Sequence, residues 1–130
     1  MLKTWSICGT VSPAEKKNRR LGIGLEKLDR NLYNPDSVFS EIGALGVGWV
    51  RIQSGWMRTE KEKGVYDFSW LDHIVDSLFA QGVTPWMCLC YGNPIYSEEE
   101  KNVNGAIGVQ PIFTAEEKAG FRNYVQKTAE

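Results

Sequence analysis

The stretch that decides the fold runs from Gly48 to Asp72 and reads GWVRIQSGWMRTEKEKGVYDFSWLD. It opens with a strand, predicted over 47–53, that is apolar on both faces, as is typical of a buried parallel strand. A polar loop over 54–68 follows. Ser69 then predicts the cap of a helix whose apolar residues recur at helical spacing. The stretch therefore contains the strand, the loop and the beginning of the helix of one βα unit.

The same alternation continues on both sides of this stretch. A short apolar strand is predicted over 21–25, and a third strand over 83–91. Asn34-Pro35 gives a helix cap followed by proline at the first helical position. Thr114 and Glu117 form a capping box that predicts a last helix, in which Phe121, Tyr124, Val125 and Thr128 line one stripe. Alternating strands and helices indicate consecutive βα units and a parallel sheet.

The connections are long at one end of the predicted sheet and short at the other. Gly46 and Gly82 stop two helices directly before strands, whereas the loops over 54–68 and 92–113 are long. Long loops on one face are typical of a (β/α)8 barrel. A dinucleotide-binding sheet is excluded, because Gly22-Ile-Gly24 lacks the third glycine of that fingerprint.

Three strands do not close a barrel, which needs eight strands and about 250 residues. We therefore expect an α/β fold in which 21–130 form about three βα units, the N-terminal and incomplete part of a (β/α)8 TIM barrel. Residues 1–20 are expected to be an N-terminal extension, with a possible short strand over 4–11 and a charged connector.

Composition excludes several classes of function. The chain has 130 residues, 15 Lys+Arg against 16 Asp+Glu, and a net charge of −1, so we expect no nucleic-acid partner. No apolar run approaches the roughly 20 residues that span a membrane, and the N-terminus does not read as a signal peptide. Three cysteines, an odd number, argue against a secreted disulfide framework. A cytoplasmic location is the default expectation, and the oligomeric state stays open.

The central stretch resembles the clan A glycoside hydrolases, TIM-barrel families that include cellulases, β-xylosidases and β-galactosidases. The residues that carry the resemblance are Trp49-Val50-Arg51, Trp56, Glu60, the GVYDFSWLD segment 64–72, Tyr91-Gly92-Asn93-Pro94, and the GLEKLDR segment 24–30. The resemblance covers about residues 20–130. It departs at Glu60-Lys61, where many members have Glu-Pro.

The resemblance implies hydrolysis of O-glycosidic bonds in oligo- or polysaccharides by a retaining mechanism. That mechanism uses one glutamate as general acid/base and a second as nucleophile. The clan carries them at the ends of strands four and seven, so both are expected beyond residue 130. The chain then reads as a partial glycoside hydrolase domain with a carbohydrate substrate. The alternatives are a catalytically inactive truncated remnant, a sugar-binding fragment, or another class of TIM-barrel enzyme.

The same resemblance assigns five candidate site residues. Arg51 matches the arginine that supports the nucleophile, and Trp56, Tyr91 and Asn93 fall in the sugar-binding rim. Glu26 ends the first strand and could accept a hydrogen bond from a sugar hydroxyl.

Each assignment has a structural alternative. Arg51 could cap a loop or pair with a structural carboxylate, and Glu26 could pair with Arg30 or Arg51. Trp56 could equally be a hydrophobic plug beneath its loop.

No cofactor or metal is expected. Cys88 and Cys90 point to one face of their strand, but a zinc site needs about four ligands, so core packing is the favoured reading. His73, the only histidine, is expected to be exposed. The run Glu98-Glu99-Glu100 and the basic segment 16–20 are expected to be solvated.

Overall fold

A computed structural model describes residues 15, 20–97 and 113–130. The predicted strand over 4–11, Cys8 and the acidic run 98–100 lie outside these residues. Strands β1 (Gly22–Gly24), β2 (Trp49–Gln53) and β3 (Thr84–Cys88) form one parallel sheet in the order β1-β2-β3. The parallel α/β arrangement is confirmed. It is compatible with part of a TIM barrel, although the described residues do not form a closed barrel.

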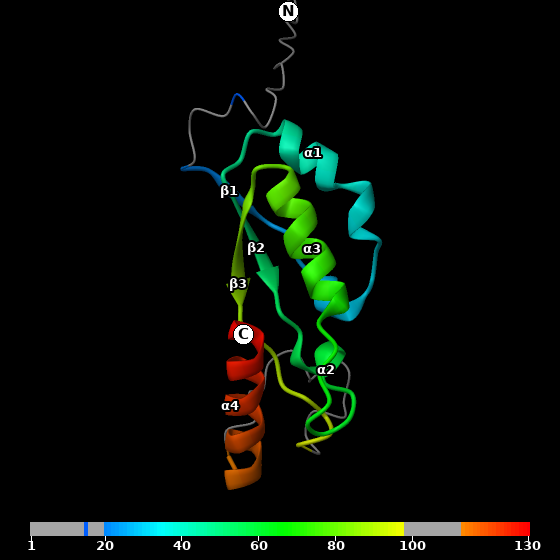
Figure 1. Ribbon diagram of the computed structural model, residues 1–130, viewed down its shortest axis with the longest axis vertical. Helices are drawn as coiled ribbons and strands as arrows, with labels where there is room; N and C mark the ends of the chain where they lie inside the picture. The colour runs from blue at the N-terminus through cyan, green and yellow to red at the C-terminus, as the bar shows by residue number, and fades with distance from the viewer. Residues whose placement is uncertain (1–14, 16–19, 98–112) are drawn as a thin grey trace, which may run out of the picture.

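The helices lie on one side of this sheet or beyond its end (Figure 1). Their bounds are η2 (Leu28–Arg30), η3 (Pro35–Ser37), α1 (Phe39–Ala44), α2 (Trp56–Thr59), α3 (Ser69–Ala80) and α4 (Ala115–Ala129). Helices α1 and α3 cover one face of the sheet, and α4 lies beyond the tip of β3. The short helix α2 falls inside the predicted polar loop and was not predicted.

The core lies between β2 and helices α1 and α3. Val50 and Ile52 of β2 are fully buried in one cluster with side chains from both helices: Phe39, Ile42, Leu71, Ile74 and Leu78. The opposite face of β2 is open, with Trp49 46% exposed. The prediction that β2 is buried on both faces is therefore wrong for the described residues, because their helices cover only one face.

Two glycines act as predicted, since Gly46 and Gly82 have φ of 74° and 67° and each directly follows the C-cap residue of its helix, α1 or α3. A left-handed φ costs glycine little, because it has no Cβ. The capping box of α4 is also confirmed. The amide of Glu117 donates to Thr114 Oγ1 at 3.1 Å, and that of Thr114 donates to Glu117 Oε2 at 2.8 Å.

The predicted start of α3 is wrong in detail. Ser69 is the first helical residue rather than the cap, and it donates from both its amide and its hydroxyl to Asp67 Oδ1, at 3.0 and 2.6 Å. A carboxylate is the stronger acceptor and suits the positive end of the helix dipole. These bonds lower the pKa of Asp67. No described helix is long and apolar enough to cross a membrane.

The buried stripe of α3 gives a direct test of the core. Leu78 is fully buried, whereas its neighbour Phe79 is 56% exposed. We expect Leu78→Ala to lower the free energy of unfolding by about 2–5 kcal/mol, since it leaves a cavity. The control Phe79→Ala should cost less than about 1 kcal/mol. Urea denaturation followed by circular dichroism measures both, and equal losses would contradict this packing.

Candidate functional site

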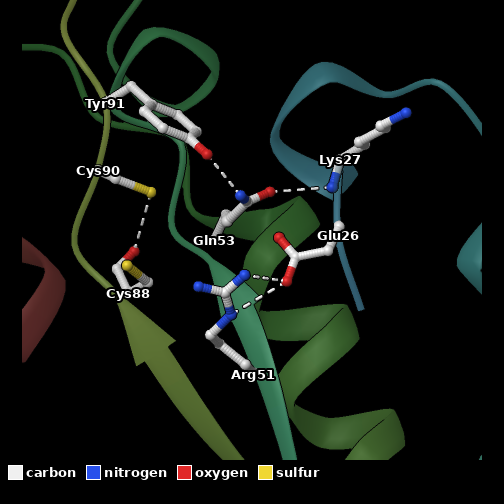
Figure 2. A network of polar contacts seen from close by, with 7 residues as sticks. All are labelled: Glu26, Lys27, Arg51, Gln53, Cys88, Cys90 and Tyr91. Atoms are coloured by element: carbon white, nitrogen blue, oxygen red, sulfur yellow. Dashed lines mark hydrogen bonds and ion pairs between the residues drawn. The ribbon is translucent and has the colours of Figure 1, made fainter. Parts of the chain in front are cut away.

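An ion pair joins the carboxyl ends of β1 and β2. Arg51 Nε donates to Glu26 Oε1 at 3.0 Å, and Arg51 Nη2 donates to the same oxygen (Figure 2). Both side chains are partly exposed, and the bonds to Glu26 raise the pKa of Arg51. Of the alternatives for Glu26, the structure shows the pairing with Arg51. The carboxylate and the guanidinium thus face solvent together at one end of the sheet.

A second pair of side chains joins β2 to the loop after β3. Gln53 Nε2 donates to the Tyr91 hydroxyl at 2.6 Å, and the amide of Lys27 donates to Gln53 Oε1 at 2.9 Å (Figure 2). Burial raises the pKa of Tyr91. Gln53 therefore holds the segments that follow β1 and β3 at fixed positions beside Arg51.

The Glu26–Arg51 pair lines a cavity of about 490 Å3 on the open face of the sheet. Its lining residues are Arg20, Gly22, Ile23, Gly24, Glu26, Trp49, Arg51 and Trp86. The volume is within the range of small-ligand sites. A Cβ at Gly24 would lie 2.6 Å from Glu26 Oε1, so a glycine here leaves room for the carboxylate. The cavity combines charged groups with indole rings, which suits a polyhydroxylated ligand that has apolar C–H faces.

Three residues predicted to contact the sugar, Trp56, Tyr91 and Asn93, do not line this cavity. Trp56 is 0% exposed, with its ring centroid 4.9 Å from that of Tyr96 and 5.5 Å from that of Tyr124. Asn93 is also buried, and its Nδ2 donates to the carbonyl oxygen of Glu60 at 2.7 Å. The structure thus favours the plug alternative for Trp56, and it gives Asn93 a loop-joining contact in place of a sugar contact.

Glu60 is a buried carboxylate whose role sequence reasoning missed. Its side chain accepts hydrogen bonds from Trp56 Nε1 at 2.5 Å, from the Gly64 amide at 2.7 Å and from the Tyr96 hydroxyl at 2.7 Å. Burial, followed by the Glu60 carboxylate, raises the pKa of Tyr66 to about 12. The spacing of four residues between Trp56 and Glu60 was the available signal, since such residues face each other on a helix.

Asp29 is a second buried carboxylate that was missed. Burial raises its pKa, and its Oδ2 lies 3.9 Å from Arg30 Nε. Gly55, with φ of 56°, packs so closely that a Cβ there would lie 2.6 Å from Asp29 Cβ. This contact brings the loop after β1 against the loop after β2, but Asp29 does not line the cavity beside Arg51.

The cysteines and the histidine form no metal site in the described part of the chain, where no three potential ligands converge. The Cys90 thiol donates to the carbonyl oxygen of Cys88 at 3.3 Å, and burial raises its pKa to about 12. His73 is exposed, as predicted, and its Nε2 lies 2.6 Å from Asp36 Oδ1.

The contacts of Glu60 predict a charge-specific effect on stability. Glu60→Gln places an NH2 group among three donors, so at least one hydrogen bond is lost inside the protein. We expect the free energy of unfolding to fall by about 1–3 kcal/mol. Glu62→Gln, an exposed position on the same loop, is the matched control and should change it by less than about 0.5 kcal/mol. A chemical denaturation series that ranks the two variants equally would contradict the assigned contacts.

Comparison with known proteins identifies the family. The model of the beta-galactosidase family matches residues 28–98, which is more than half of the chain. The matched segment includes Arg51, Gln53, Glu60 and Tyr91, and Glu26 lies two residues before it. No solved structure matches the chain. The chain belongs to the beta-galactosidase family of glycoside hydrolases.

Proposed function

We propose that this chain forms part of the sugar-binding and catalytic cleft of a retaining glycoside hydrolase that cleaves β-galactosides. The observation that carries the proposal is the convergence of Glu26, Arg51, Gln53 and Tyr91 at the carboxyl ends of three adjacent parallel strands. Active sites of TIM-barrel enzymes lie at this end of the strands. The family match supplies the substrate class.

Arg51 would orient the glutamate that acts as nucleophile and would keep that glutamate ionised. A guanidinium has five N–H donors, and the contacts with Glu26 use only two of them. The remaining donors can reach a second carboxylate from the open side of the cavity. A nearby cation lowers the pKa of a carboxyl group, which keeps it ionised for attack.

Glu26 and Tyr91 would contact the sugar itself. Both hydrogen bonds from Arg51 end on Glu26 Oε1, and Oε2 accepts none from the described residues, so it can accept one from a sugar hydroxyl. The Tyr91 ring is held at the rim by Gln53. Trp56 and Asn93 act in this proposal by holding the loops in place, not by touching the sugar.

The reacting glutamates would come from outside these 130 residues. A retaining glycosidase needs two carboxyl groups about 5–5.5 Å apart. Among the residues that line the cavity, Glu26 has the only carboxylate, and it is paired with Arg51. The described part of the chain can therefore bind and orient a sugar but lacks the second carboxyl group.

The same observation favours one second candidate, carbohydrate binding without hydrolysis. A site with one carboxylate, two guanidinium groups and exposed indole rings at Trp49 and Trp86 is sufficient for binding. Turnover distinguishes the two candidates, because only a hydrolase that contains both glutamates cleaves an aryl galactoside.

We expect the 130-residue chain to bind galactose at this cavity. In an NMR titration with galactose, the indole N–H signals of Trp49 and Trp86 should shift, with a weaker response to the C4 epimer glucose. Glu26→Gln and Arg51→Lys should each weaken binding about tenfold or more, since each removes a charge-assisted hydrogen bond. Arg122→Lys on α4, an exposed position, is the control. Shifts that are absent, or that survive both substitutions, would contradict the site.

We also expect the 130-residue chain to release no nitrophenol from 4-nitrophenyl β-galactoside above the uncatalysed rate, because Glu26 is the only carboxylate among the described residues that line the cavity. Measurable turnover that disappears in Glu26→Gln would show that Glu26 itself reacts. That result would refute our placement of both catalytic glutamates outside the chain.

A further inference from the structure

A second cavity lies on the helix-covered side of the sheet, away from Arg51. It has a volume of about 590 Å3 and opens between the segment 31–35 and the start of α3. Asn31, Tyr33, Asn34, Arg58, Trp70 and His73 are among its lining residues. The volume is within the range of small-ligand sites, and the lining mixes aromatic rings with hydrogen-bonding groups, as such sites do. The proposed hydrolase site uses none of these residues.

Arg58 is the main charge in this cavity. Its guanidinium lies 4.1 Å from the centroid of the Trp70 ring, and its Nη1 donates to the carbonyl oxygen of Leu28. It makes no ion pair with any residue that the structure describes. Burial lowers the pKa of Arg58, and the attraction of Asp29 and Asp67 offsets this only in part. The cation is therefore positioned by neutral groups and has donors left for a ligand.

Two acidic groups near the cavity are bound to other residues, and a third, Asp29, attracts Arg58 without forming an ion pair with it. Asp36 Oδ1 lies 2.6 Å from His73 Nε2, and Asp67 accepts both hydrogen bonds from Ser69. Neither carboxylate neutralises Arg58 by direct contact. An anion that entered the cavity would therefore meet a cation that Asp29 and Asp67 attract but that makes no ion pair with either of them in the described part of the chain.

The remaining polar groups are mostly donors. The indole N–H of Trp70 is buried and has no acceptor among the described residues. Asn31 and Asn34 add side-chain amides, and Asn34 Oδ1 already accepts from the Asp36 amide at 3.1 Å. A lining rich in donors suits a ligand rich in oxygen acceptors.

We propose that this cavity binds a small hydroxylated carboxylate, a sugar acid of the uronate type. The carboxylate would pair with the Arg58 guanidinium in a bidentate manner, the geometry for which arginine is best suited. The ring hydroxyls would bind the asparagine amides, and the apolar face of the ring would pack against Tyr33. The site is separate from the Arg51 cavity, so it does not depend on the hydrolase proposal.

The test is an NMR titration of the full 130-residue chain with D-galacturonate, with D-galactose and acetate as separate arms. We expect galacturonate to shift the Trp70 indole and Arg58 signals to saturation. Galactose, which lacks the carboxylate, and acetate, which lacks the hydroxyls, should each bind at least tenfold more weakly here. Equal binding of galactose, or shifts confined to Trp49 and Trp86, would overturn the proposal and leave the Arg51 site unaffected.

Two variants locate the binding. Arg58→Gln should weaken galacturonate binding at least tenfold, whereas Arg122→Gln on α4 removes the same charge at an exposed position and should leave it unchanged. Arg58 also donates to the carbonyl oxygen of Leu28, so its substitution could impair folding. A second variant therefore removes a different ligand-binding group. Asn31 has φ of 53°, which glycine adopts readily, so Asn31→Gly deletes the amide without backbone strain and should weaken binding about fivefold. Unchanged affinity in Asn31→Gly would refute the site even if Arg58→Gln fails to fold.

Discussion

The alternation of side chains along β2 is the constraint on which the rest of this structure depends. Val50 and Ile52 are buried against α1 and α3, and successive side chains on a strand point to opposite faces. Arg51 must therefore lie on the open face. A shift of β2 by one residue would bury the guanidinium and expose the apolar pair, at a cost of several kcal/mol of lost burial. The position of the candidate site follows from the core.

Local signals in the sequence predicted the three strands and the helices α3 and α4. The glycines at 46 and 82 and the capping box of α4 each depend on residues near each other in the chain, and all agree with the structure. The pairing of Glu26 with Arg51 was among the alternatives, because both end adjacent parallel strands. The motif resemblance pointed to the family.

Contacts between distant residues explain what the sequence could not predict. Trp56 is buried because Tyr96 and Tyr124, 40 and 68 residues further along, stack on it, and no local pattern encodes that. The loop contact of Asn93 has the same origin, since its acceptor is the carbonyl oxygen of Glu60. Ser69 is a local exception, because its amide and its hydroxyl both donate to Asp67 Oδ1, two residues earlier. Aromatic residues and amides in loops are thus ambiguous between sugar contact and packing.

The carboxyl end of β2 is also joined to the far end of the chain. The Tyr124 hydroxyl of α4 donates to Ser54 Oγ, and the Ser54 hydroxyl in turn donates to the carbonyl oxygen of Cys88 at 3.1 Å. Ser54 directly follows Gln53, which orients Tyr91. Docking of α4 and binding of a ligand in the cavity beside Arg51 are consequently linked equilibria. A ligand that prefers the arrangement in which Gln53 holds Tyr91 stabilises the docked helix. Detachment of the helix lowers the affinity for that ligand by the same factor.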